Sequence, residues 1–146
     1  MFEMLKVALL IAGILHLLPL SAGLTMPRVL RWGSDLGKLD ALTRQLFWVH
    51  GAFIVMTILA FGLITVTAAD SMLQGTPLAI GIAAFIGFFW LLRLLIQLFY
   101  FDARPWLTNS FRTVGCNTLT FVFGYFSVVY LLTAWFNMIL VCRSCQ

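Results

Sequence analysis

Hydrophobic residues in this sequence are gathered into four long stretches, and polar residues are concentrated in the connections between them. The stretches cover residues 5–24, 46–69, 78–101 and 116–141. Because an α-helix rises about 1.5 Å per residue, each stretch is long enough to cross the roughly 30 Å hydrocarbon core of a bilayer. The pattern predicts an all-α membrane protein, a four-transmembrane-helix bundle that forms a single integral membrane domain over residues 1–146.

The first apolar stretch allows a second interpretation, a secretory signal peptide. Lys6 precedes the apolar run, and the small residues at 21–23 resemble a signal-peptidase cleavage site. His16 and Pro19 interrupt the run, which favours a transmembrane helix over a signal peptide.

The first connection mixes basic and apolar residues between Pro27 and Gln45. Apolar side chains recur there every three or four residues, with charged side chains between them. This spacing predicts a short amphipathic helix that lies on the membrane surface between the first and second transmembrane helices. A solvated loop is the alternative, because Gly33 and Gly37 weaken a helix.

The third apolar stretch contains one permanent charge, Arg93. A guanidinium is costly near the centre of a membrane unless it is paired, hydrated or extended to the headgroups. Trp90, Arg93, Gln97 and Tyr100 follow the spacing i, i+3, i+7 and i+10, so they share one face of the helix. This face is expected to look into the bundle.

Composition agrees with a membrane environment. Hydrophobic residues make up 62% of the 146 residues and charged residues 10%, and the mean hydropathy is +1.04. Such values exclude a soluble domain of this length. The net charge of +4 comes mostly from the connections, which indicates contact with membrane lipids and not with nucleic acid.

The positive charges also predict an orientation. Six Lys and Arg residues lie in the first and third connections, whereas the opposite side of the membrane has Lys6 and Arg143. Because cytoplasmic connections are enriched in basic residues, both termini are expected to be non-cytoplasmic. The membrane is expected to be a bacterial inner membrane or another plasma membrane.

Polar residues from all four stretches fall in the cytoplasmic half of the membrane. His16 and Arg93 each lie about 12 Å, and His50 about 6 Å, from the cytoplasmic ends of their helices. We therefore expect a polar pocket that opens toward the cytoplasm, in which Arg93 pairs with inward-facing groups such as His50 and Asn117. Seven residues are predicted to bind a ligand there: His16, His50, Trp90, Arg93, Gln97, Tyr100 and Asn117.

Several uses of this pocket are compatible with the residues. The two histidines, with Gly13 and Gly51 near them, are suited to hold b-type haem between helices, although their depths differ by about 6 Å. A quinone or a lipid headgroup is compatible with Arg93, whose guanidinium suits an oxygen-rich ligand. Alternatively, the histidines are hydrogen-bonded within the bundle, or the pocket serves metal binding or proton transfer.

The sequence contains no nucleophile elbow, P-loop, dinucleotide fingerprint or HExxH motif, so we predict no catalytic residues. Three cysteines, including Cys142 and Cys145 at CxxC spacing, are too few for a disulfide framework or a four-cysteine zinc site.

Small residues four positions apart favour close association between membrane helices. They occur at Ala83 with Gly87 and at Thr120 with Gly124. Together these features indicate a non-catalytic accessory subunit or oligomeric scaffold of a membrane complex, homo- or hetero-oligomeric. The alternative is a redox or ligand-binding bundle that holds haem, quinone or a lipid headgroup near His16, His50 and Arg93.

Overall fold

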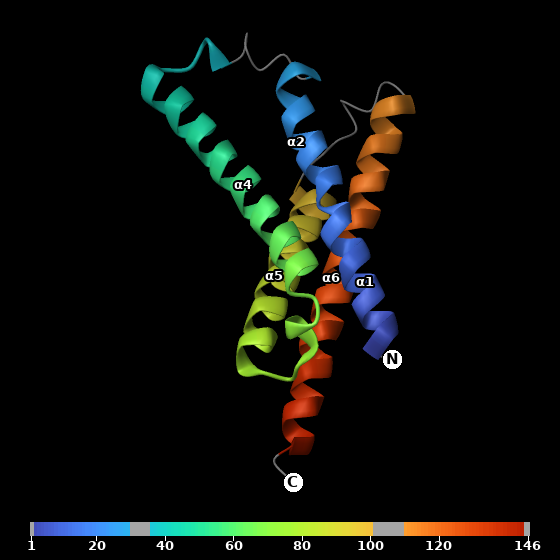
Figure 1. Ribbon diagram of the computed structural model, residues 1–146. Coiled ribbons are helices and arrows are strands. Elements are labelled where there is room, and N and C mark those ends of the chain that lie inside the picture. Colours follow the sequence, from blue (N-terminus) through green and yellow to red (C-terminus); the bar gives the residue numbers. More distant parts are fainter. Residues whose placement is uncertain (1, 30–35, 101–109, 145–146) are drawn as a thin grey trace.

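A computed structural model describes residues 2–29, 36–100 and 110–144 of the chain (Figure 1). The described residues form helices joined by turns, without a β-strand. The elements in chain order are α1 (Phe2–Leu15), α2 (Leu17–Val29), α4 (Ala41–Thr67), the 3₁₀ turn η1 (Ser71–Leu73), α5 (Pro77–Leu95), the π-helical turn η2 (Ile96–Tyr100) and α6 (Ser110–Ser144).

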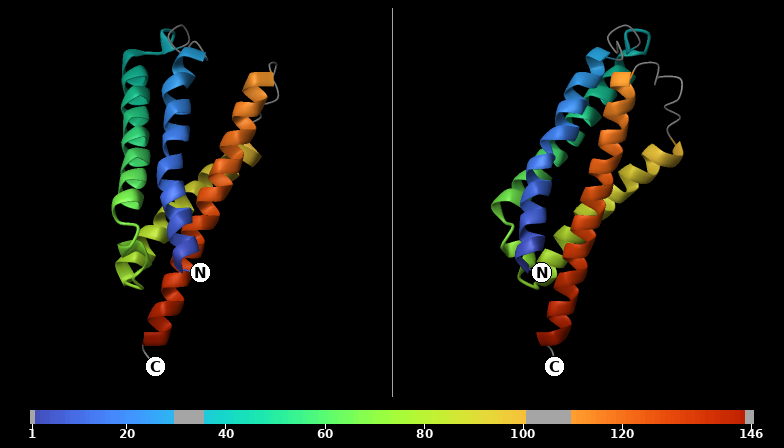
Figure 2. Two further views of the ribbon diagram at one scale, coloured as in Figure 1. Left: turned by 45° about the vertical axis from the view of Figure 1, so that its right-hand side comes forward. Right: turned by 90° about the vertical axis from the view of Figure 1, so that its right-hand side faces the viewer.

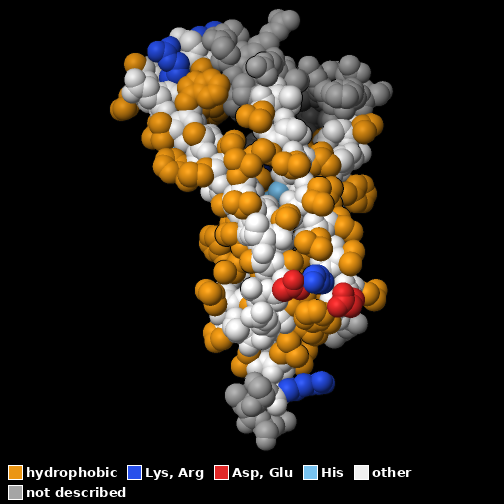
Figure 3. Space-filling view, viewed as in Figure 1, with side chains coloured by type: hydrophobic (Ala, Val, Ile, Leu, Met, Phe, Trp, Pro, Cys, Tyr) orange, Lys and Arg blue, Asp and Glu red, His pale blue; other side chains and the backbone are white. Residues whose placement is uncertain are grey.

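The structure confirms the prediction of an all-helical chain with four helices that are long and apolar enough to cross a membrane. These candidate spans are Phe2–Thr25, Ala41–Thr67, Pro77–Tyr100 and Thr113–Arg143. Hydrophobic side chains lie over the whole length of the molecule in Figure 3, whereas charged side chains appear at its upper end, in one cluster in its lower half and beside its lower end. This distribution is the one that a bilayer requires of a multi-pass protein.

The predicted interfacial helix between the first two spans falls partly outside the described residues, since residues 30–35 are not described. On either side of this gap, α2 continues to Val29 and α4 begins at Ala41. Asp40 caps α4, because its carboxylate accepts a hydrogen bond from the Thr43 backbone N–H at 3.1 Å. Hydrogen bonds from the Thr43 side chain and from its backbone N–H favour the ionised carboxylate and lower the pKa of Asp40.

The first span is interrupted at His16, between α1 and α2. Pro19 explains the break, because proline has no N–H to donate to the Leu15 carbonyl and its ring crowds that carbonyl. The His16 N–H still donates to the Ala12 carbonyl at 3.2 Å, and the Leu20 N–H donates to the His16 carbonyl at 3.4 Å. The two helices therefore continue one another as a single distorted span.

The four spans are packed at one end of the bundle and diverge at the other. We call these parts the closed half, which contains the N-terminus and the connection between α4 and α5, and the open half, which contains the end of α2, the start of α4, η2 and the start of α6. Toward the open half, the last buried residues of the spans are Pro19, Ile58, Trp90 and Val122.

Beyond that level the helices separate. Every residue of α4 from Ala41 to His50 is exposed, and Figure 1 shows this part of α4 diverging from α2. In the right-hand view of Figure 2, the end of η2 also lies apart from α6, although Gln97 of η2 is still hydrogen-bonded to the Thr120 hydroxyl of α6. The described core of the protein therefore occupies the closed half.

Glycines allow the helices to approach closely in the closed half. A Cβ on Gly13 of α1 would lie 2.6 Å from the Val66 side chain of α4, and one on Gly62 would lie 3.1 Å from the His16 Cβ. On α5, a Cβ on Gly87 would lie 2.9 Å from the Leu131 Cγ and 3.2 Å from the Leu131 backbone nitrogen of α6. The predicted pair of small residues at Ala83 and Gly87 thus packs inside the bundle.

The second predicted pair of small residues, Thr120 and Gly124, is used differently. A Cβ on Gly124 would meet nothing within 4 Å, so this glycine permits no close helix contact within the chain. Thr120 instead accepts a hydrogen bond from a side chain of η2, as described below.

The connection between α4 and α5 is held by both α6 and α1. Asn137 of α6, which is fully buried, accepts a hydrogen bond from the Gly75 N–H at 2.7 Å and donates one to the Met72 carbonyl at 2.8 Å. From α1, Lys6 forms an ion pair with Asp70. These contacts place Asp70 and Gly75 at the same end of the molecule as the N-terminus.

Gly87→Ala is expected to lower the free energy of unfolding by about 1–3 kcal/mol, because the added methyl group would press on the Leu131 backbone. Gly81→Ala on the same helix is the matched control, since a Cβ there meets nothing within 4 Å. Equilibrium unfolding of the purified variants in detergent compares the two. Equal stability of both variants would contradict the α5–α6 packing.

Candidate functional site

His16 is the buried polar group at the centre of the bundle, with 3% of its surface exposed. Its Nδ1 lies 2.7 Å from the Ala12 carbonyl oxygen, which can only accept, so Nδ1 carries the hydrogen. Its Nε2 accepts a hydrogen bond from the indole N–H of Trp90 at 3.2 Å. A neutral imidazole protonated on Nδ1 satisfies both bonds, and both ring nitrogens are then occupied.

Aromatic side chains from three other helices, α4, α5 and α6, surround this imidazole. The ring of His16 stacks on Phe126 of α6, with centroids 4.3 Å apart and an interplanar angle of 20°. It makes edge contacts with Trp90 at 5.4 Å, Tyr130 at 6.0 Å and Phe61 at 6.5 Å. We call these five residues the aromatic layer. Because all four spans contribute to it, the layer ties the spans together.

Hydrogen bonds continue from the aromatic layer into the closed half. The Thr65 hydroxyl donates to the Phe61 carbonyl at 2.7 Å, and the Tyr130 hydroxyl lies 2.6 Å from the Thr65 oxygen and donates to it. Asn137 joins α6 to the connection between α4 and α5. Among the residues that the structure describes, no buried side-chain nitrogen or oxygen lacks a hydrogen-bond partner.

This second set of polar groups was not predicted, because the polar residues of the four apolar stretches were expected in the cytoplasmic half of the membrane. Thr65, Tyr130, Thr133 and Asn137 are all fully buried in the closed half. The signal that pointed to them is Asn137, an amide within an apolar helix, four residues after Thr133. In hydrocarbon such an amide needs partners, and its donors bond the Thr133 and Met72 carbonyls, each at 2.8 Å.

Of the predicted ligand-binding residues in the open half, Gln97 has well-defined partners. Its amide nitrogen donates to the Thr120 hydroxyl at 2.6 Å and to the Cys116 carbonyl at 3.3 Å. Gln97 lies in η2, where the backbone follows a π-helical turn. These bonds join α5 to α6 above the aromatic layer.

The prediction that Trp90, Arg93, Gln97 and Tyr100 share an inward face is only partly correct. Trp90 is buried and Gln97 is half-buried, whereas Arg93 is exposed and Tyr100 has 82% of its surface exposed. The π-helical turn explains part of the difference, because it changes the angular spacing of residues after Leu95. Arg93 is also offset by about 60° from Trp90 on an ideal helix.

The expected pairing of Arg93 with His50 and Asn117 is not formed among the described residues. The guanidinium carbon of Arg93 lies 6.0 Å from the centre of the Phe123 ring. His50 and Asn117 are exposed, and the His50 Nδ1 lies 3.2 Å from the Leu46 carbonyl of its own helix. For His50, the physical reason is the separation of this part of α4 from the neighbouring helix α2 in the open half (Figure 1).

The two histidines do not fit a shared haem in this arrangement. Gly62 of α4 lies beside His16, and His50 precedes Gly62 by twelve residues. Along a helix this separation is about 18 Å, whereas two axial ligands must lie level with the iron. The His16 Nε2, moreover, is already the acceptor of the Trp90 hydrogen bond.

The described part of the chain contains no cluster of three or more His, Cys, Asp and Glu side chains that could hold a metal ion. Cys116 and Cys142 are free thiols, and Cys145 lies outside the described residues.

An apolar groove of about 300 Å³ runs beside His16 on the outer surface between the first span and α4. Its lining is apolar apart from the imidazole, whose nitrogens are both engaged, so the groove suits a hydrocarbon chain better than a polar ligand. The lining residues are Gly13, Ile14, His16, Leu17, Ile58, Leu59, Gly62, Leu63 and Val66.

His16→Leu is expected to reduce the free energy of unfolding by about 1–3 kcal/mol, because it leaves the buried Trp90 N–H without an acceptor. In a Trp90→Phe background the same substitution should cost about 1 kcal/mol less, since no donor is then left unpaired. Equilibrium unfolding of the four proteins in detergent measures this coupling.

His50→Leu is the control for these substitutions, because His50 is exposed and its Nδ1 lies beside the Leu46 carbonyl of its own helix. The free energy of unfolding of this variant should differ little from that of the wild type. Strictly additive costs of the His16 and Trp90 substitutions would show that the bond between them contributes nothing.

Comparisons with known proteins give no identification of this chain. Its sequence matches no protein-family model and no curated protein, and its fold matches no solved structure. The function proposed below therefore rests on the contacts and the exposed fractions of the described residues.

Proposed function

We propose that this protein is a small multi-pass membrane protein without a catalytic role, which serves as an accessory subunit or an oligomeric scaffold of a membrane complex. The observation that carries the proposal is the complete pairing of buried polar side chains among the described residues. His16, Trp90, Thr65 and Tyr130 use their polar atoms to join helices of the same chain.

This pairing favours a structural role for the aromatic layer. A binding or catalytic centre keeps donors and acceptors available for its ligand, as pockets with a few convergent polar groups do. In the aromatic layer the imidazole has no free nitrogen, and the rings around it fill the space between the spans. The layer therefore supports the fold, and recognition is left to the outer surfaces of the helices.

The outer surfaces of the open half favour association with other membrane helices. Residues Ala41 to His50 of α4 are exposed on every side of the helix. Large apolar side chains of this segment, such as Leu42 and Leu46, have 73% and 56% of their surfaces exposed. A membrane-embedded partner, either another subunit or a second copy, would pack against these side chains in place of lipid.

We further propose that the open half faces the cytoplasm and that both termini are non-cytoplasmic, in a bacterial inner membrane or another plasma membrane. The support is the distribution of Lys and Arg, six of which lie in the two connections of the open half. Arg93 and Gln97 would then belong to the cytoplasmic leaflet, next to its anionic lipids.

Arg93 supports a second candidate function, the binding of a lipid headgroup or of a quinone oxygen. Its guanidinium is exposed, and it forms no ion pair among the described residues. A phosphate at the membrane surface would satisfy it, since an arginine side chain can extend several ångströms toward the headgroups. Tyr100 and Asn117, also exposed in the open half, are the further polar groups for such a ligand.

The proposed orientation predicts that a reporter fused after Gln146 lies outside the cytoplasm. Alkaline phosphatase, which is active only after export, should be active there, and a fluorescent reporter restricted to the cytoplasm should be dark. The reverse result would overturn the orientation. A fusion within residues 101–109 of the third connection is the internal control and should give the opposite pattern.

The non-catalytic role predicts that the purified protein has no Soret absorption and no reduced-minus-oxidised haem bands. Solvent extraction should release no stoichiometric quinone. A haem spectrum or one quinone per chain would contradict the scaffold proposal.

The same preparation tests the second candidate function. If Arg93 holds an anionic phospholipid, native mass spectra should show adducts that fall at least threefold in Arg93→Leu and less in Arg93→Lys. Unchanged adducts in Arg93→Leu would remove the headgroup site.

A further inference from the structure

The two nitrogens of the His16 imidazole bind different parts of the chain, and the two hydrogen bonds respond differently to a proton. Nδ1 donates to the Ala12 carbonyl of the same span at 2.7 Å, whereas Nε2 accepts from the indole N–H of Trp90 on α5 at 3.2 Å. A protonated imidazole carries a hydrogen on both nitrogens, so neither can accept. Protonation therefore keeps the bond within the first span and removes the bond to α5.

The lost bond would leave two donors facing each other in a buried place. Trp90 is 1% exposed and His16 is 3% exposed, so water does not reach them as a substitute acceptor in this arrangement. A buried donor without a partner and a buried charge without a counter-charge both destabilise a packed arrangement. The aromatic layer therefore requires the neutral form of the imidazole.

The groups around His16 in the described chain do not compensate a positive charge. His16 forms no ion pair among the described residues. The helices packed against it contribute no carboxylate and present Phe61 and Gly62 from α4, Trp90 from α5, and Phe126 and Tyr130 from α6.

The polar and charged groups closest to this layer are engaged elsewhere. The Tyr130 hydroxyl bonds to Thr65, and the guanidinium carbon of Arg93 on α5 lies 6.0 Å from the centre of the Phe123 ring. The stacked Phe126 ring attracts a cation, but only weakly compared with the cost of burying an unpaired charge. An imidazolium is thus disfavoured in the closed arrangement.

His16 lies at the level where the spans begin to diverge. The first span is interrupted at this residue, and the Leu20 nitrogen lies 3.4 Å from the His16 carbonyl oxygen, which is a long hydrogen bond. Toward the open half, Trp90 is the last buried residue of α5, and α2 and α4 diverge (Figure 1). A change at His16 therefore acts at the boundary between the two halves.

Other contacts hold the first span below this boundary. Tyr125 of α6 donates to the Ala8 carbonyl at 2.9 Å, and Lys6 forms an ion pair with Asp70. Neither contact involves the imidazole. A charge on His16 would therefore release the first span from α5 at the level of the aromatic layer, while α1 stays attached in the closed half.

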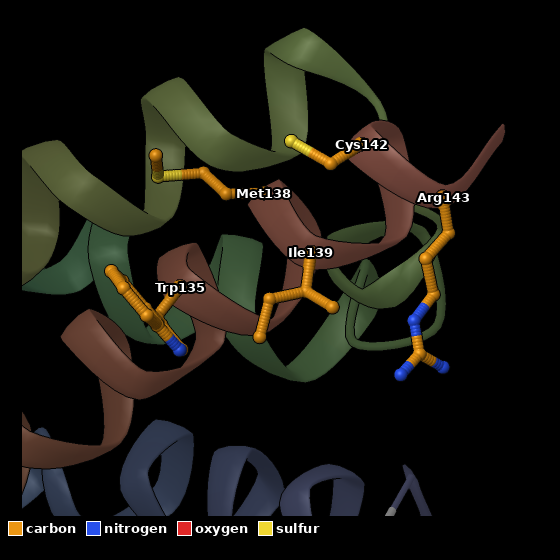
Figure 4. Close-up of a pocket in the computed structure, with 5 residues that line it drawn as sticks. All are labelled: Trp135, Met138, Ile139, Cys142 and Arg143. Carbon is orange, nitrogen blue, oxygen red and sulfur yellow. The ribbon is translucent and has the colours of Figure 1, made fainter. Parts of the chain in front are cut away.

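Other features of the described surface lack this arrangement. His50 is exposed, and its Nδ1 lies beside the Leu46 carbonyl of its own helix. A groove of about 250 Å³ along α6 contains no histidine and no carboxylate, and Figure 4 shows its lining residues Trp135, Met138, Ile139, Cys142 and Arg143. His16 is therefore the histidine whose charge is coupled to a contact between spans.

We propose that His16 is a proton-sensitive switch, which holds the first span against α5 when the imidazole is neutral and releases it on acidification. Histidine is the side chain that ordinarily changes its charge between about pH 5 and pH 8. The released ring binds a proton more readily than the ring in the aromatic layer, so a lower pH favours the released state. This switch goes beyond the proposed function and does not depend on a partner.

Distances between spin labels in lipid nanodiscs, which expose both faces of the membrane to buffer, test the release. In a chain whose three native cysteines are replaced by serine, labels at Leu24→Cys of α2 and Leu92→Cys of α5 occupy exposed positions above the layer. Their mean distance should increase by several ångströms between about pH 7.5 and about pH 5. Labels at Met4→Cys and Leu78→Cys, exposed positions of the closed half, are the control pair and should not shift.

The two histidines of the chain provide matched variants. His16→Gln keeps a side-chain oxygen that can accept from Trp90 but does not titrate, so the label distance should stay short at every pH. His50→Gln should keep the full shift. Trp90→Phe is a second test if His16→Gln does not fold, because no N–H then opposes the protonated ring, and the shift should fall at least twofold.

The ¹⁵N NMR spectrum of histidine-labelled protein reports the protonation of the ring itself. His16 should be neutral with its hydrogen on Nδ1 at about pH 7.5, and its cation should appear with the same midpoint as the distance shift.

Each result decides the proposal. An unchanged distance over this pH range, a shift that persists in His16→Gln, or a shift that vanishes in His50→Gln would overturn the switch. Protonation of His16 without a change in distance would do the same. None of these results affects the absorption, extraction and reporter measurements, which test the proposed function.

Discussion

The structure depends on the pairing of buried polar groups in its four candidate membrane spans with partners within the protein. In a hydrocarbon layer an unpaired donor or acceptor costs several kcal/mol, and water is not available as a substitute. The bonds from His16 to Trp90 and from Tyr130 to Thr65 satisfy this rule between helices. Each bond therefore also fixes the register of one helix against another, which apolar packing alone defines less sharply.

The division into closed and open halves follows the same rule. In the closed half, Asn137 and the aromatic layer connect the first span, α4, α5 and α6, and glycines such as Gly62 allow close crossings. Above that level the hydrogen bonds of Gln97 join α5 to α6, while α4 from Ala41 to His50 is exposed. A helix in lipid satisfies its own backbone, so this part of α4 can remain helical without neighbours.

The sequence predicted the spans well and their mutual placement poorly. Length and hydropathy are properties of each segment by itself, so the four predicted stretches agree within a few residues with the four candidate spans of the structure. Depth was estimated along each helix separately, and such an estimate cannot show the axial offset of one helix relative to another. This offset determines that Gly62, and not His50, lies beside His16. His16 was expected to bind a ligand, with hydrogen bonding within the bundle as the alternative; its partner Trp90 lies 74 residues away and has no local signal.

Because of these contacts, the proposed binding of partners takes place on the outer surfaces of the helices. Polar atoms that hold the closed half together are not available to a ligand, and the apolar rings between the spans leave that region filled. In a membrane an apolar surface gains little by leaving lipid, so a partner must offer better packing than lipid chains do.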